Sequence, residues 1–223
     1  MKKKIAAISL CIALLAVAVI GGTIAYFTDT TETVTNTFVV GDIKITLDEQ
    51  KVKTDGTPDG DSRVKSNTYV MVPGRTYTKD PTVTVKANSE ACYVRIKVQV
   101  TGLDALKTAI NKEKNPECFN GDILLLEKFV GGWDNTKWLA NGAWAFDGTD
   151  TYEFRYAAPV AKADTDTKLE PLFTTFTLPG FFTEETVKAL GEANLAFAVT
   201  AEAIQADGFS DATAAWNAFP AAN

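Results

Sequence analysis

The sequence predicts an all-β protein, a jelly-roll-like antiparallel β-sandwich with a few short peripheral helices. Three observations favour this class: runs of alternating apolar and polar residues, turn residues between those runs, and abundant aromatic residues (13 Phe, 6 Tyr and 4 Trp). With 223 residues, 46% of them hydrophobic, the chain can fill the core of one large sandwich. We expect a cleaved signal peptide at 1–25, a mobile N-terminal segment at 26–37 and a single sandwich domain at 38–223.

The N-terminus has the features of a secretory signal peptide. Lys2–Lys4 form a basic start, and Ile5–Ile20 form an uncharged apolar run of 16 residues. This run falls short of the ~20 residues that a membrane-spanning helix needs, although a permanent membrane anchor is the alternative. Thr23 and Ala25 place small residues at the two positions that a signal peptidase reads, so we expect cleavage before Tyr26.

Cleavage between Ala25 and Tyr26 is directly testable. N-terminal sequencing of the exported protein is expected to begin at Tyr26, because the apolar run ends just before the small residues of the site. A start more than a few residues away, or an intact Lys2–Ile20 segment, would contradict the prediction.

Alternation of apolar and polar residues predicts the strands of the sandwich. A first strand is expected to begin at Phe38 and lead into Ile43–Leu47, and the most regular run is Cys92–Val100. The other predicted strands are Tyr69–Val72, Val83–Val85, Ile123–Val130, Tyr152–Tyr156 and Leu195–Ala201. Between the first two strands, Lys51–Asn67 is rich in Gly, Pro and Asp, which is typical of a long polar loop.

Three short helices are predicted at the periphery. Leu103–Lys112 has apolar residues at helical spacing. Thr183 is a candidate N-cap followed by two glutamates, and Gly191 is expected to end that helix. A C-terminal helix is expected to start at Ser210 or Asp211.

Three groups of residues invite a site interpretation. Cys92 and Cys118, the only cysteines after the signal, can pair in an exported protein or can remain buried thiols. The acidic residues of Asp55–Asp61 suggest calcium, but an EF-hand loop needs a carboxylate where Ser66 stands, so turn chemistry is the better explanation. The tryptophans, for which core or subunit packing is favoured over a carbohydrate-binding surface, are Trp133, Trp138 and Trp144.

Composition argues against several classes of function. The chain has no histidine, which removes the usual general base and the commonest zinc ligand, and no catalytic residue, metal site or cofactor is predicted. The net charge of −6 falls to −9 when the three lysines of the signal leave. An acidic protein without a basic stripe is a poor partner for nucleic acid, and we expect membrane contact only through the uncleaved signal peptide.

Several motifs, taken together, resemble those of a known family. Gly21–Asp29 and Asn36–Ile45 look like the SipW-type signal and first strand of the camelysin/TasA family of exported Gram-positive proteins. Lys79–Pro81 and Tyr93–Arg95 are similar to elements that recur in this family in the same order, and Ala201–Phe209 resembles the closing motif of its Clostridia-type branch.

The resemblance implies a fold, a location and a role. Family members are jelly-roll sandwiches that a dedicated ER-type signal peptidase processes, and the best-known ones assemble into biofilm-matrix fibres. We therefore expect a secreted structural subunit in the extracellular matrix or at the cell surface, with copies of itself, and an accessory fibre subunit, as partners. A secreted adhesin or carbohydrate-binding module is the alternative. Camelysin itself is classed as a metallopeptidase, but the absence of histidine favours a non-enzymatic role here.

The segment that cleavage would release is a candidate donor strand. It contains six threonines between Tyr26 and Phe38, with bulky side chains at Tyr26, Phe27, Val34 and Phe38. Such a β-branched, polar run favours a strand but has too little apolar surface to fold on itself. We expect it to add as a strand to a sheet edge or groove of a neighbouring copy.

Overall fold

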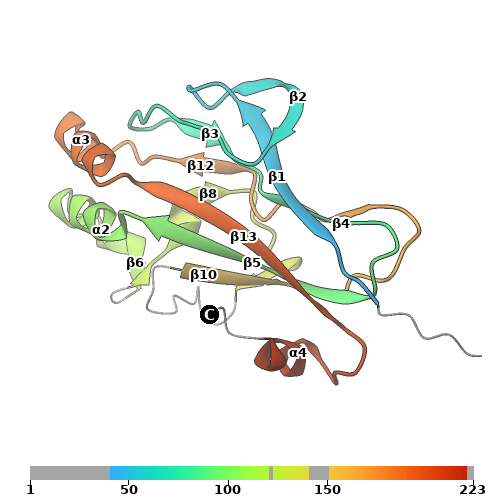
Figure 1. The fold of residues 1–223 in the computed structure, drawn as a ribbon. Coiled ribbons are helices and arrows are strands. Elements are labelled where there is room, and N and C mark those ends of the chain that lie inside the picture. Colours follow the sequence, from blue (N-terminus) through green and yellow to red (C-terminus); the bar gives the residue numbers. More distant parts are fainter. Residues whose placement is uncertain (1–40, 121–122, 141–150, 220–223) are drawn as a thin grey trace, which may run out of the picture. The chain divides into compact units, whose positions relative to one another are not determined.

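The computed structural model describes residues 41–120, 123–140 and 151–219, which form antiparallel β-sheets with short helices at their ends (Figure 1). The first sheet has the order β11-β4-β1-β2 and the second the order β13-β5-β10-β9. The strands of these two sheets are β1 (Ile45–Val52), β2 (Pro58–Val64), β4 (Thr82–Val85), β5 (Cys92–Thr101), β9 (Trp138–Ala140), β10 (Thr151–Tyr156), β11 (Thr167–Lys168) and β13 (Ala196–Gln205). The predicted all-β sandwich is confirmed.

Smaller elements complete the described part of the chain. A third sheet has the order β3-β12-β8, and β6 pairs with β7. Their bounds are β3 (Thr76–Thr78), β6 (Phe119–Asn120), β7 (Ile123–Leu124), β8 (Val130–Gly131) and β12 (Thr175–Thr177), with helices α2 (Leu103–Lys112), α3 (Glu184–Glu192) and α4 (Ala212–Ala218) and 3-10 turns at Pro116–Cys118 and Leu126–Lys128. Within these residues, no helix is long and apolar enough to cross a membrane.

The core lies on one face of β5. Alternate residues of this strand are fully buried, as their spacing predicted: Cys92, Val94, Ile96, Val98 and Val100. They belong to one hydrophobic cluster with apolar side chains from the first and third sheets. Both long neighbours of β5 are antiparallel to it, β10 on one side and β13 along its whole length on the other.

The opposite face of β5 explains where the C-terminal helix packs. Arg95 is only 9% exposed, and its guanidinium bonds to Glu153 (3.2 Å) and Glu202 (2.5 Å) on the neighbouring strands. The same guanidinium lies over the rings of Trp216 and Phe219, at 4.4 and 4.8 Å from their centroids. Helix α4 therefore covers a polar sheet face through a cation–π contact rather than through apolar packing alone.

Two predicted helices match the structure closely. Helix α2 spans Leu103–Lys112 as predicted, with its apolar stripe buried. Helix α3 begins after Thr183, whose hydroxyl accepts from the Thr186 N–H, while the Thr186 hydroxyl accepts from the Thr183 N–H. This reciprocal capping box fixes the start of the helix at the predicted residue.

The predicted loop at Lys51–Asn67 is wrong, because β2 forms within it and pairs with β1 as a hairpin. Gly56, at φ +85°, makes the turn and packs so closely on Tyr77 that a Cβ there would approach the Tyr77 backbone to 2.8 Å. Arg63 on β2 bonds to Asp48 and Asp80, which ties the polar strand to the sheet. All seven residues of β2 are exposed or half-buried, so the strand lacks the alternation of buried apolar residues by which a strand is predicted from sequence.

Two predicted strands are also wrong in position or continuity. Residues Tyr69–Val72 form no strand; instead the Tyr77 hydroxyl accepts from the Val72 N–H (2.7 Å) and donates to the Val70 carbonyl (2.9 Å). The strand here is β3, which contains Tyr77. The run Ile123–Val130 is split into β7, a 3-10 turn and β8, because its buried residues do not alternate with a period of two.

Candidate functional site

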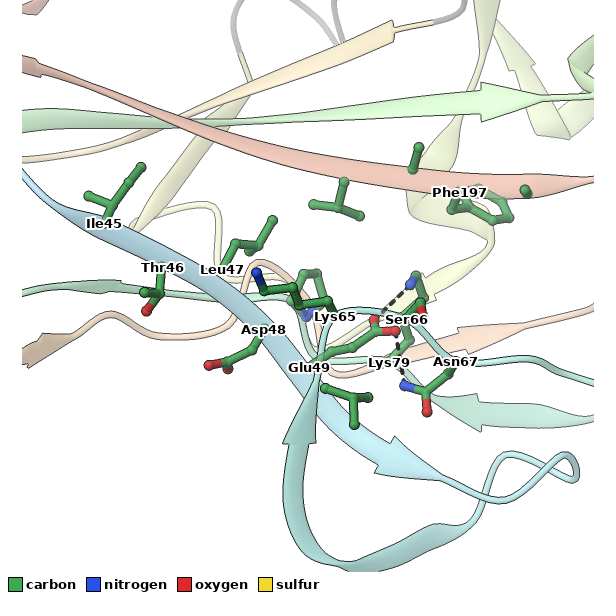
Figure 2. Close-up of a pocket in the computed structure, with 15 residues that line it drawn as sticks. Ile45, Thr46, Leu47, Asp48, Glu49, Lys65, Ser66, Asn67, Lys79 and Phe197 are labelled. Atoms are coloured by element: carbon green, nitrogen blue, oxygen red, sulfur yellow. Dashed lines mark hydrogen bonds and ion pairs between the residues drawn. The ribbon is translucent and has the colours of Figure 1, made fainter.

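A groove of about 680 Å³ lies between β1 of the first sheet and β13 of the second (Figure 2). We call it the β1–β13 groove. Ile45 and Leu47 point from β1 toward β13, while Thr46 and Asp48 point the other way. Ile45 and Leu47 were predicted to face the core, and they are half-buried against it. The groove therefore has an apolar floor that the described residues only partly cover.

Strand β13 borders the groove with an open edge. Of the described strands, only β5 pairs with it, so its other edge offers unpaired main-chain groups. Phe197, Val199 and Ala201 alternate along β13 and are half-buried against the core. The sequence predicted a last strand at Leu195–Ala201; the structure extends it to Gln205 and places it at a sheet edge.

Strand β1 borders the other side and is open along its first half. Residues Ile45–Asp48 pair with β4 on one edge, whereas the described pairing with β2 on the other edge starts only at Glu49. Beyond that point the Asn67 side chain also binds the main chain of β1, because it accepts from the Val52 N–H (3.0 Å) and donates to the Gln50 carbonyl (2.8 Å). Two open strand edges thus face one groove.

A buried ion pair closes one end of the groove. The Lys79 ammonium donates to Glu49 at 2.8 Å, and the Asn67 amide donates to the other oxygen of that carboxylate at 2.9 Å (Figure 2). Glu49 is 6% exposed and Lys79 is 9% exposed. Sequence reasoning did not find this cluster, since its members come from three separate segments of the chain.

Past this ion pair, a second cavity of about 280 Å³ continues from the groove and shares Asn67, Lys79, Ala196 and Phe197 with it. We call it the aromatic pocket; its other lining side chains are Tyr69, Met71, Tyr77, Phe176 and Leu195, with Thr68. Its rings contact one another. The ring centroids of Phe176 and Phe197 are 4.7 Å apart, and those of Tyr69 and Tyr77 are 5.5 Å apart in an edge-to-face arrangement. Burial, and then the charge of Glu49, raise the pKa of Tyr69, so its hydroxyl stays protonated and donates to the Thr78 carbonyl.

The residues predicted for export and strand donation lie outside the described part of the chain. They are Thr23, Ala25 and Tyr26 at the expected cleavage site, and Tyr26, Phe27, Val34 and Phe38 of the candidate donor strand. The described chain begins at Gly41 and reaches β1 four residues later.

The two cysteines do not make a reactive site. Cys92 and Cys118 are buried and are free thiols in the structure. Burial raises the pKa of Cys92 to about 11, and burial together with the nearby Glu117 raises the pKa of Cys118. Thiols with raised pKa values are poor nucleophiles at neutral pH.

Of the three predicted tryptophans, Trp138 lies in the core and Trp133 packs against it. Trp138 is fully buried and donates its indole N–H to the Glu170 carbonyl at 2.9 Å. Trp133 is half-buried, donates to the Trp138 carbonyl at 2.9 Å and meets Phe154 edge to face. Trp144 lies outside the described residues. Packing, the favoured interpretation, therefore accounts for the first two.

Two carboxylates of the Asp55–Asp61 stretch bind neighbouring groups of the same hairpin. Asp55 accepts from the N–H and hydroxyl of Thr57, which is turn chemistry, and Asp59 pairs with Lys51 at 2.7 Å. Within residues 41–120, 123–140 and 151–219, no three His, Cys, Asp or Glu side chains come together as metal ligands would.

The comparisons with known proteins bear on the N-terminal part. Residues 1–68 match the family model described as camelysin metallo-endopeptidase. No curated protein and no solved structure matches the chain. The SipW-type signal and the Clostridia-type branch remain predictions. Over residues 1–68 the chain thus carries the sequence signature of the camelysin family, in agreement with the camelysin/TasA-like resemblance of its N-terminal motifs.

Proposed function

We propose that the protein is a secreted structural subunit of an extracellular biofilm-matrix or surface fibre, joined by insertion of one copy's N-terminal segment into the next copy's β1–β13 groove. The observation that carries this proposal is the groove itself. Two strand edges that lack partners among the described strands face each other across half-buried apolar side chains. An extended segment placed there would hydrogen-bond to the open edge of β13 and cover part of the apolar floor.

The N-terminal segment is the occupant that the chain itself offers. It runs for 13 residues from Tyr26 to Phe38, which is about 43 Å when extended, and is rich in β-branched residues. The first half of β1, from Ile45 to Asp48, spans only about 14 Å. The segment is therefore long enough to fill the groove and to reach beyond it at one end.

Signal cleavage would act as the assembly switch. Before the cut the segment is tethered through Ile5–Ile20, and afterwards its end at Tyr26 is free to enter a groove. Donor and acceptor are different surfaces, so each copy can give one strand and receive one, and the contact propagates into a filament. The partners are copies of this chain, a dedicated signal peptidase and an accessory fibre subunit, outside a Gram-positive cell.

No catalytic residue is part of this role. The family model carries a peptidase name, but the chain has no histidine, and the described carboxylates around the groove pair with cations or amides. The adhesin alternative depended on the tryptophans, of which Trp138 and Trp133 pack inward. No described feature favours a second function over strand insertion.

A charge in the groove is expected to block assembly. Val199→Glu would place a carboxylate on the groove side of β13, where an inserted strand would bury it, and fibre growth should slow by more than about tenfold. Growth would be followed by light scattering and electron microscopy of the processed protein.

The matched control for this variant is Thr200→Glu, which adds the same charge one residue along the same strand. Thr200 is exposed and lies opposite Lys97 on β5, so the new carboxylate stays in water beside a cation. Both variants should keep the wild-type circular dichroism spectrum. Equal growth rates for the two variants would argue against the groove as the acceptor site.

A further inference from the structure

The aromatic pocket and the point where the N-terminal segment leaves the domain lie at opposite ends of the sandwich. Residue Asp42 is held beside the turn between β4 and β5, since its carbonyl accepts from the Glu90 N–H at 3.0 Å. That turn leads into Cys92, which pairs with Gln205 at the far end of β13. The aromatic pocket is lined by Ala196 and Phe197, at the start of β13. Ten residues of strand, about 33 Å, separate these two ends.

This placement determines how an inserted strand would run. In a head-to-tail filament the donor leaves one copy at the Asp42 end and enters the next copy at the opposite end, by the aromatic pocket. The last residues of the inserted segment then stay at the pocket, while its free end lies near Ile45. Such a strand runs antiparallel to β13, and antiparallel pairing is the more stable kind.

We infer that the aromatic pocket binds Phe38 of the neighbouring copy and thereby sets the direction and register of the inserted strand. This inference rests on the proposed function. Phe38 is three residues before Gly41, so it can reach no more than about 10 Å beyond its own domain. The domains of the two copies must then be in contact at the pocket, because only the short stretch between Phe38 and Gly41 connects them.

The order of side chains along the segment matches the order of surfaces along the groove. Residues two apart share one face of a strand, so Phe38, Asn36 and Val34 point the same way. From the pocket toward Ile45, the acceptor presents aromatic rings, then the polar cluster of Glu49 with its partners, then the apolar side chain of Leu47. Phe38 would therefore contact the aromatic rings of the pocket, the Asn36 amide would face the polar cluster of Glu49, and Val34 would pack on the apolar floor at Leu47.

The reverse direction gives a poorer match. With Phe27 in the pocket, Asp29 would lie beside the Glu49 carboxylate, and like charges repel. With Tyr26 in the pocket, Thr28 and Thr30 would follow, which leaves a hydroxyl over the apolar floor at Leu47. The forward direction satisfies all three surfaces of the acceptor.

Disulfide trapping between two separately purified variants tests this assignment. Met71 lines the pocket, so processed Met71→Cys protein serves as the acceptor, and processed Phe38→Cys protein serves as the donor. The two are mixed under mild oxidation, and mass spectrometry identifies the linked peptides. Cys92 and Cys118 are buried and do not compete. The matched control donor is Phe27→Cys, and the control acceptor is Leu139→Cys, an exposed position on β9.

We expect a link between positions 38 and 71 and none between 27 and 71 or between 38 and 139. A link between 27 and 71 instead would overturn the assignment of Phe38 and reverse the strand, while leaving strand insertion intact. Fibres that depend on residues 26–35 without either link at 71 would overturn the role of the pocket. If fibres form equally well without residues 26–35, strand insertion itself is contradicted, and with it the proposed function.

A pair of substitutions tests the register by an independent readout. Asn36→Asp would bring a carboxylate to Glu49 in the acceptor and is expected to slow fibre growth by about tenfold or more. Thr37→Asp adds the same charge on the opposite face of the segment and should leave growth within about twofold. Equal effects of the two changes would contradict the register.

Discussion

Processed protein that lacks Tyr26–Thr35 is expected to remain a folded, soluble monomer and to form no fibres. The deletion leaves every described core residue in place, because the buried cluster of the described domain is built from positions after Gly41. It removes most of the main chain that would pair with the open edge of β13. Electron microscopy over time and size-exclusion chromatography measure the outcome.

Addition of the missing segment in trans supplies the control. A synthetic peptide of residues 26–38 should bind the truncated protein and should bind much more weakly when that protein also carries Val199→Glu. In the complete protein the same peptide should cap growing ends and shorten fibres. Polymerisation of the truncated protein at the normal rate would show that the donor-strand mechanism is wrong.

Elements whose stability is encoded locally could be predicted from the sequence. Strand β5 has a period-two apolar face nine residues long, and α3 has its cap and acidic first turn within four residues, so both follow from the residues alone. Strand β2 was missed because strand pairing is a long-range property. Its stability comes from pairing with β1 and from Arg63 reaching Asp48 and Asp80, and neither contact leaves an apolar pattern in the sequence.

The groove could not have been predicted for a related reason. Phe197 and Val199 alternate with small or polar residues in the same way whether a strand is central or at an edge. Only the sheet order shows that β13 pairs with β5 and that the described chain leaves its other edge open. The candidate donor strand could be predicted from the composition of residues 26–38, whereas the acceptor groove could be identified only from the order of strands in the sheets.

Replacement of Lys79 by Ala is expected to destabilise the domain strongly, by about 3–5 kcal/mol, because it leaves the Glu49 charge buried without its cation. Asn67 would remain as a neutral donor to that carboxylate, but it cannot neutralise the charge. Urea unfolding followed by tryptophan fluorescence reports the free energy of unfolding. The exposed pair Lys188–Glu192 on α3 gives a matched control, and Lys188→Ala should change stability by no more than about 0.5 kcal/mol.

A double variant separates two contributions to the free energy of unfolding: the stabilisation by the Glu49–Lys79 pair and the destabilisation by a buried charge without a partner. Glu49→Gln with Lys79→Met removes both charges and keeps the side-chain lengths, so it should be clearly more stable than Lys79→Ala alone. The fibre assay then gives the functional consequence. If the polar cluster positions the incoming Asn36, the double variant should fold and yet assemble more slowly than wild type, because Glu49 no longer presents a carboxylate to the inserted amide. A Lys79→Ala protein as stable as Lys188→Ala would mean that Glu49 and Lys79 are not the buried pair that closes this end of the groove.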